Sequence, residues 1–196
     1  MARTRAADYD ERLQAIVEEA ARLFARDGFN GTAVSDIAKA CSMSKSLLYH
    51  YYPSKEDLLY AVMSAHVETL VEDVETIGPD GGTPADELRR VLGLFMQHYM
   101  GASDQQKVLL NELENLPPER RSEIVAKQRR IVDAVQKVLV AARPELGGDS
   151  GMARARTMLL FGMLNWTMTW YDPEGPVDPA RMVDAMAEMA LGGGGA

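Results

Sequence analysis

The segment Gly31–Leu59 constrains the fold more than any other part of the chain, because it contains two short helical patterns separated by a tight turn. Ser44 occupies the position of an N-cap for the second helix, and Pro53 is unable to continue that helix. The first helix has one apolar face at three- and four-residue spacing, made of Val34, Ile37, Ala38 and Cys41. The segment therefore predicts a helix, a turn, a second helix and a stop.

The second helix carries different side chains on its two faces. Leu48 and Tyr52 are expected to face inward. The outer surface combines short polar, basic and phenolic groups, namely Lys45, Ser46, Leu47, Tyr49, His50 and Tyr51. A helix of this kind fits the major groove of DNA. Beyond Pro53, the spacing of Ser54 and Asp57 is close to a capping box and predicts the start of a longer helix.

At these residues, over about positions 12–60, the sequence resembles the TetR family of one-component transcriptional regulators. The residues that match the family pattern are Ile37, Ala38, Ser44, Tyr49, His50, Tyr51 and Lys55. Two departures are clear: Cys41-Ser42-Met43 replaces the usual Ala-Gly-Val of the turn, and Tyr52 replaces Phe. Without the turn glycine, we expect Ser42 to adopt a positive φ at a cost of about 1 kcal/mol, or the turn to differ slightly.

The resemblance implies an all-α protein with two domains. Residues 1–53 would form a three-helix helix-turn-helix DNA-binding domain, and residues 54–196 a helical ligand-binding and dimerisation domain. The implied function is a repressor that binds a palindromic double-stranded DNA operator as a homodimer and is released by a small-molecule effector. Phosphate contacts are expected mainly from Thr32, Ser35, Ser44, Tyr49, His50 and Lys55, and base-edge contacts from Lys45, Ser46 and Leu47, with the role of Tyr51 left open.

Composition supports the helical fold but gives an unusual charge for a DNA-binding protein. Helix formers are abundant and alternating apolar runs are few, whereas the net charge is −8. Since phosphate contacts need positive charge, that charge must be local to the second helix, at Arg3, Arg5, Lys39, Lys45 and Lys55. We expect modest nonspecific binding. The arm Arg3–Arg5 is either a disordered leader or a segment that reaches a DNA groove.

Several classes of protein are not supported by the sequence. Cys41 is the single cysteine, so an intrachain disulfide is impossible; it is expected to pack as a small core residue, with a redox role as the alternative. No apolar run resembles a signal peptide or reaches the ~18 residues of a membrane span. We therefore expect a cytoplasmic protein that does not bind membranes.

The remaining pattern predicts seven further helices. The first helix is expected over about residues 10–26, with Gly28 as its stop. The others are expected at about residues 54–76, from Thr83-Pro84 through Tyr99, 103–115, from Pro118 to before Pro144, 150–171 and 178–191. Gly78–Gly82 is expected to form a turn, and Gly192–Gly195 a flexible tail.

The last two helices are the best candidates for the dimer interface. Residues 158–168 are apolar on more than one face of the helix, so a single subunit would leave apolar surface exposed. In the resembled family, the equivalent helices of two subunits form a four-helix bundle. A two-fold dimer places two recognition helices about one helical turn of DNA, ~34 Å, apart.

An effector pocket is expected between helices of the second domain. The candidate ligand-binding residues are Phe95, Tyr99, Leu109, Leu113, Met163, Asn165, Trp166 and Trp170. The segment Phe161–Tyr171 resembles the corresponding helix of regulators that respond to acyl-coenzyme A (acyl-CoA) thioesters. Two interpretations of Trp166 are open: packing on the acyl group, or burial in the dimer interface. Phosphates of the effector would meet arginines such as Arg129, Arg154 or Arg156.

Two rival functions differ from this interpretation. An enzyme would need catalytic groups, but the three histidines (His50, His66 and His98) form no catalytic or metal motif, and we expect no catalytic residue, metal or cofactor. His66 and His98 lie on predicted inner faces, where hydrogen-bonded core histidines are the usual case and binding of a metal or of a ligand carboxylate is the alternative. A sensor of lipophilic or cationic drugs from the same family is the other rival, with Glu112 and Glu114 as counter-charges.

Overall fold

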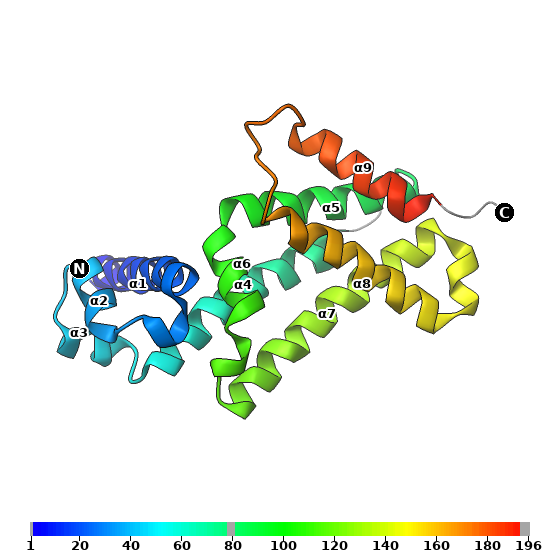
Figure 1. The fold of residues 1–196 in the computed structure, drawn as a ribbon. Coiled ribbons are helices and arrows are strands. Elements are labelled where there is room, and N and C mark those ends of the chain that lie inside the picture. The colour runs from blue at the N-terminus through cyan, green and yellow to red at the C-terminus, as the bar shows by residue number, and fades with distance from the viewer. Residues whose placement is uncertain (1, 78–80, 193–196) are drawn as a thin grey trace. The chain divides into compact units, whose positions relative to one another are not determined.

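The computed structural model describes residues 2–77 and 81–192, with side chains from Tyr9 onward. The described residues are all-α and contain no strand, as expected. The helices are α1 (Ala2–Gly31), α2 (Val34–Ala40), α3 (Lys45–Tyr51), α4 (Lys55–Thr76), α5 (Pro84–Gly101), α6 (Ser103–Asn111), α7 (Pro118–Ala142), α8 (Ser150–Thr167) and α9 (Pro179–Leu191), with short 3-10 helices η1 (Leu113–Asn115) and η2 (Pro144–Gly148) (Figure 1). None of these helices is both long and apolar enough to cross a membrane.

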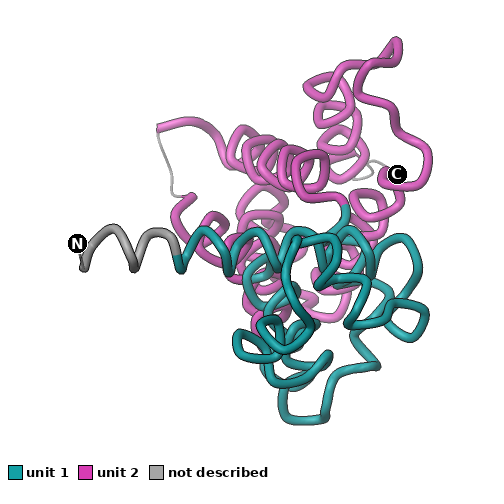
Figure 2. Tube along the Cα trace, turned by 90° about the vertical axis from the view of Figure 1, so that its left-hand side faces the viewer, with its two compact units in different colours: residues 1–67, 104–125 teal, residues 68–103, 126–196 magenta. Residues whose placement is uncertain are grey.

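The helices pack into two compact units (Figure 2). Unit 1 comprises residues 1–67 and 104–125, and unit 2 comprises residues 68–103 and 126–196. The chain therefore passes through each unit twice, and both α4 and α7 contribute to both units. Compactness and function are different criteria, so the functional division into residues 1–53 and 54–196 stays a prediction.

Unit 1 is organised around α1, which begins at Ala2, earlier than expected. The backbone of Arg3–Arg5 is therefore helical and is not a disordered leader. Gly28 interrupts α1 with φ 75° and ψ 163°, a conformation that favours glycine, which confirms the predicted stop. The apolar face of α1 is buried from Ile16 to Phe24, whereas Leu13 is half-buried. The buried residues from α1, α2, α3 and α4 include Ile16, Phe24, Ile37, Leu48, Leu58, Leu59 and Met63.

Unit 2 begins with a complete capping box on α5. The Thr83 hydroxyl accepts the Asp86 N–H at 3.2 Å, and the Asp86 carboxylate accepts the Thr83 N–H at 3.0 Å, as expected for Thr83-Pro84. Phe95 of α5 packs edge-on against Phe161 of α8, with ring centroids 5.4 Å apart. The α9 helix lies along α5, and Arg143, which is 4% exposed, donates to the Ala190 carbonyl near the end of α9.

Some helix ends differ from the sequence-based expectation. The α6 helix ends at Asn111, and η1 occupies part of the segment that was expected to extend it. The α8 helix ends at Thr167, before Tyr171, and the Tyr171 hydroxyl donates to the Val177 carbonyl in the following loop. Within the expected turn Gly78–Gly82, residues 78–80 lie outside the described residues, as do residues 193–195 of the expected tail.

Candidate nucleic-acid interface

The α3 helix owes its position to one cap and one buried anchor. The Ser44 hydroxyl accepts the Leu47 N–H at 3.1 Å, which satisfies a donor that the helix itself leaves unpaired. Leu48, only 1% exposed, holds the inner face of α3 against unit 1. The helix ends at Tyr51, Tyr52 follows it in extended conformation, and the chain bends at Pro53. The predicted helix, turn, helix and stop are confirmed.

The turn between α2 and α3 contains a strained serine. Ser42 has φ 53°, and among the described residues it is the one non-glycine residue with positive φ. The Met43 N–H bonds to the Ala38 carbonyl and the Ser42 N–H to the Lys39 carbonyl, the pattern of a Schellman motif. This position usually carries glycine, so the predicted positive φ of Ser42 is confirmed. Cys41 precedes it; the thiol is half-buried, and that burial raises its pKa, which keeps it protonated.

The outer face of α3 is exposed from Lys45 to His50. Leu47 is 38% exposed and Tyr49 39% exposed, and Lys45 lies 5.6 Å from the centre of the Tyr49 ring. Tyr51 is half-buried and packs on Tyr9 of α1, with ring centroids 5.3 Å apart. The expected interface residues with exposed side chains are Ser35, Ser44, Lys45, Ser46, Leu47, Tyr49 and His50.

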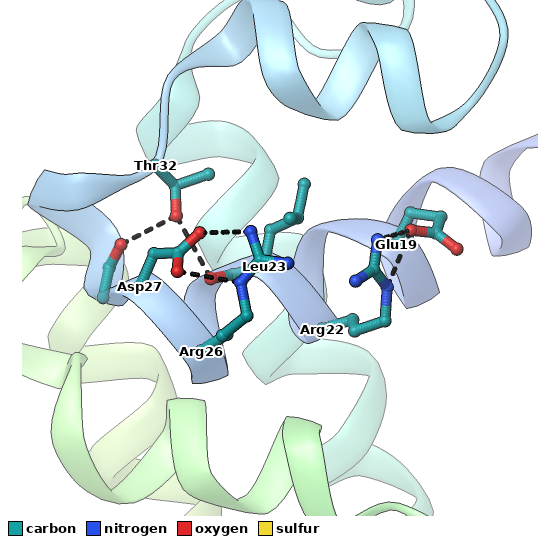
Figure 3. Close-up of polar contacts among 7 residues, drawn as sticks. Glu19, Arg22, Leu23, Arg26, Asp27 and Thr32 are labelled. Carbon is teal, nitrogen blue, oxygen red and sulfur yellow. Dashed lines mark hydrogen bonds and ion pairs between the residues drawn. The ribbon is translucent and has the colours of Figure 1, made fainter.

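Thr32 and Lys55 have internal roles that differ from the expected phosphate contacts. Thr32 is 3% exposed, and its hydroxyl lies 2.8 Å from the Gly28 carbonyl oxygen and 3.2 Å from that of Leu23 (Figure 3). The Lys55 ammonium donates to the carbonyls of Phe29 at 2.6 Å and Thr32 at 2.9 Å. Both side chains close the kink at Gly28, so each is a structural contact between α1 and the following helices.

Two arginines of α1 are neutralised by neighbouring carboxylates (Figure 3). Arg22 pairs with Glu19 at 2.7 Å, and Arg26 pairs with Asp27 at 2.6 Å. The hydrogen bond from Arg26 lowers the pKa of the Asp27 carboxyl, so this pair stays ionised at neutral pH. Positive charge available to a phosphate in unit 1 is therefore smaller than the number of basic residues suggests.

The expected effector residues do not all share one environment. In unit 2, Phe95 and Tyr99 are buried with ring centroids 6.1 Å apart, and Met163 and Asn165 are half-buried. Trp166 is 67% exposed and Trp170 is 58% exposed in the single chain. The other two candidates, Leu109 (buried) and Leu113 (half-buried), belong to unit 1.

His66, His98 and the proposed counter-charges already have partners. His66 lies 2.7 Å from the Gln106 side chain, and His98 lies 2.5 Å from the Asp73 carboxylate. Glu114 forms an ion pair with Arg121, and Glu112 accepts a hydrogen bond from Asn115. Within residues 2–77 and 81–192, no group of histidine, cysteine and carboxylate side chains is arranged to hold a metal.

Comparison with known protein families assigns the chain to one of them. Residues 16–62 match the family model described as "Bacterial regulatory proteins, tetR family", and residues 81–194 match "Tetracyclin repressor-like, C-terminal domain". The chain belongs to the TetR family. The resemblance inferred from the motif around Ser44 is therefore confirmed, and the TetR family consists of regulators and not of enzymes.

Solved TetR structures superpose on most of the chain. A TetR-family transcriptional regulator from Bordetella parapertussis is 36% identical, with a TM-score of 0.87 over 93% of this chain and 95% of its own. AibR, solved in complex with isovaleryl coenzyme A and operator DNA, is 30% identical, with a TM-score of 0.78 over 91% of this chain and 97% of its own.

Curated relatives share shorter stretches. The HTH-type transcriptional regulator YuxN of Bacillus subtilis is 32% identical over 61% of this chain, and that match covers 41% of YuxN. The match to YerO of the same organism covers 39% of YerO. The chain thus spans less than half the length of these two relatives.

Proposed function

We propose that this protein is a transcriptional repressor that binds a palindromic DNA operator as a homodimer and is released by a small-molecule effector. The observation that carries the proposal is the α3 helix, which is capped by Ser44 and anchored by Leu48 so that Lys45, Ser46 and Leu47 project from an exposed first turn. Residues at the start of a recognition helix are those that approach base edges in the major groove. Leu47 offers apolar surface for a thymine methyl group.

Exposed apolar side chains on α8 and α9 support dimerisation. Large apolar residues usually lie inside a folded protein, and a contiguous exposed group marks an interaction surface. The exposed residues of this kind on the two helices are Met152, Met158, Leu159, Trp166 and Met189. A second copy of the chain is the proposed occupant, because a two-fold dimer also presents two recognition helices to a palindrome.

We infer that the effector is an acyl-CoA thioester. The support comes from AibR, which binds isovaleryl coenzyme A, and from the aromatic group Phe95, Tyr99 and Phe161 in unit 2. Of the arginines proposed for the phosphates, Arg154 already pairs with Asp133 at 2.6 Å. Arg156 has a buried Nε that finds no hydrogen-bond partner among the described residues, so it is the better candidate for an anionic group.

The proposed coupling passes through α4, which follows α3 directly. Near its start, the Asp57 carboxylate accepts hydrogen bonds from the Ser54 hydroxyl at 2.7 Å and from Arg120 of α7 at 2.9 Å. The same guanidinium lies 4.2 Å from the centre of the Tyr60 ring. A shift of α7 on effector binding would therefore move the start of α4 and, with it, α3. Such a shift lowers DNA affinity when the effector prefers the displaced arrangement.

Selection from a random duplex pool tests the proposal. The protein should enrich a palindrome, and fluorescence anisotropy should then show release of that duplex by a member of an acyl-CoA panel that includes isovaleryl coenzyme A. A lipophilic-cation panel serves as the control for the alternative effector class. The absence of any enriched sequence would refute the regulator, whereas release by a cation alone would refute only the thioester. Sedimentation of the free protein checks the dimer independently.

A further inference from the structure

Few positive side chains of the DNA-binding part of unit 1 remain available to a phosphate. Among the described residues from Tyr9 to Val67, Arg22 and Arg26 are paired with carboxylates, and Lys55 is bound to two backbone carbonyls. Three cations have neither an acidic partner nor a bound carbonyl within the described part of the chain, namely Arg12, Lys39 and Lys45. DNA binding at physiological salt depends on cations that replace condensed counterions, so the positions of these three side chains bear directly on DNA binding.

All three cations lie near the turn between α2 and α3. Lys39 is in the last turn of α2, and Lys45 is the first residue of α3. Arg12 is exposed on α1 and lines a groove of about 440 Å³ together with Ser42, Met43 and Leu47. The groove also contains Glu19, whose charge is offset by Arg22. A face of α1 therefore continues the surface of the recognition helix at its N-terminal end.

Tyr9 joins the same face of α1 to the other end of α3. It precedes Arg12 by three residues, so the two side chains are neighbours on the helix surface. Its ring packs on Tyr51, the last residue of α3, with centroids 5.3 Å apart and planes inclined by 36°. Tyr9 nevertheless remains 47% exposed. The α1 helix thus lies beside α3 at both ends of α3.

We propose that this face of α1 is a second DNA-contacting element, in which Arg12 binds a backbone phosphate and Tyr9 is a positioning residue that fixes α3 through Tyr51. The inference rests on the proposed regulator function and deepens it. An arginine on a phosphate adds affinity without sequence preference, and a stacked tyrosine sets the angle at which α3 enters the groove. Among the described residues from Tyr9 to Val67, Arg12 is one of the three cations without an acidic partner or a bound carbonyl.

The salt dependence of operator affinity tests the role of Arg12. The selected palindrome is titrated with the full-length protein, with Arg12→Ala, and with Arg181→Ala, which removes the same charge from an exposed position on α9. Loss of one phosphate contact per subunit lowers the slope of log affinity against log salt by about 0.9, hence about 1.8 for a dimer. Between 50 and 200 mM salt, Arg12→Ala should then lose roughly tenfold less affinity than the unmodified protein. Arg181→Ala should keep the original slope.

The titrations separate a failure of the Arg12 phosphate contact from a failure of the proposed function. Equal slopes for Arg12→Ala and the unmodified protein would overturn the phosphate contact, while operator binding by the unmodified protein would leave the proposed function intact. No operator at all would instead refute the proposed function.

Two substitutions at Tyr9 separate positioning from charge. Tyr9→Phe keeps the ring on Tyr51 and should bind the operator within about twofold of the unmodified protein. Tyr9→Ala removes the ring and should weaken operator binding about tenfold with the salt slope unchanged, since no phosphate contact is lost. Thermal unfolding of both variants checks that the fold is retained. Unchanged operator affinity in folded Tyr9→Ala would overturn the positioning role.

Discussion

Lys55 offers a sharp test of whether a basic residue near α3 stabilises the fold or binds DNA. Its ammonium donates to the carbonyls of Phe29 and Thr32 and lies 4.2 Å from the centre of the Phe29 ring. Replacement by Met keeps the apolar stem and removes the charge. The variant Lys55→Met therefore loses two charge-assisted hydrogen bonds and one cation–π contact and leaves two partly buried carbonyls without this donor.

The expected loss of stability is large for one side chain. A hydrogen bond to a charged group contributes about 1.5–3 kcal/mol, and a partly exposed cation–π contact about 0.5–1 kcal/mol. Allowing for water that replaces part of the lost bonding, Lys55→Met should destabilise the protein by about 2–4 kcal/mol. For a chain of this size that corresponds to a fall in Tm of roughly 5–15 °C.

Lys39→Met provides the matched control. Lys39 is exposed at the end of α2, and no partner is described for it, so its removal should change stability by less than about 0.5 kcal/mol. Denaturant unfolding measures both variants, and operator titration at two salt concentrations measures DNA binding. We expect Lys55→Met to lose stability while the slope of log operator affinity against log salt stays unchanged. We expect Lys39→Met to keep its stability and to show a smaller slope. A stable Lys55→Met protein with a reduced salt slope would refute the structural role of Lys55.

Three further predictions concern other parts of the fold. Ser42→Gly should raise the free energy of unfolding by about 0.5–1 kcal/mol, because glycine adopts positive φ without strain, and denaturant titration would expose any error in sign. Hydrogen bonds from Thr83 lower the pKa of Asp86 below its ordinary value of 3.8, so the α5 cap stabilises the fold fully above pH 3.8 and is lost as the pH falls through the lowered pKa. Asp86→Asn should therefore abolish this part of the acid dependence of stability, measured as the free energy of unfolding between pH 5 and 2. An unaltered pH dependence in the variant would contradict the role of Asp86. Trp166→Ala should raise the dimer dissociation constant at least 30-fold, about 2 kcal/mol, in sedimentation experiments; an undisturbed dimer would place Trp166 outside the interface.

The local signals in the sequence predicted the helix-turn-helix well. Ser44, Thr83 and Gly28 each act on backbone groups within a few residues, so their effects depend little on the rest of the fold. The strained turn was predictable for the same reason, since the missing glycine left Ser42 as the residue that must adopt positive φ. Short-range chemistry of this kind can be inferred before any tertiary contact is known.

The roles of Thr32 and Lys55 were not predictable in this way. Position in a family motif identifies a residue type, but it does not tell whether the side chain points to DNA or into the protein. Lys55 binds a carbonyl 26 residues away, and that contact exists only after α1 kinks at Gly28 and α4 packs beside it. Tyr9 was missed because a single tyrosine in the first helix carries no pattern, and only its contact with Tyr51 gives it a place.

The effector region was the least predictable part of the chain. Apolar periodicity indicated the buried face of α5, which includes Phe95, but in α8 it did not separate buried residues such as Leu164 from exposed ones such as Leu159. It did not show that α6 would end at Asn111 or that Leu109 and Leu113 would pack in unit 1. An effector pocket depends on how several helices meet, and helical spacing within each helix does not determine that arrangement.

The most direct test of the account is a second operator selection with Lys45→Ala, compared with the selection by the unmodified protein. If the first turn of α3 reads base edges, the variant should lose its preference at one position in each half-site, a change worth about 1–3 kcal/mol per base pair, and keep the remaining palindrome. The two losses should be symmetric, because both subunits carry the substitution. Enrichment of an identical palindrome with full preference at every position would show that Lys45 reads no base and would contradict the assignment of α3 as the recognition helix.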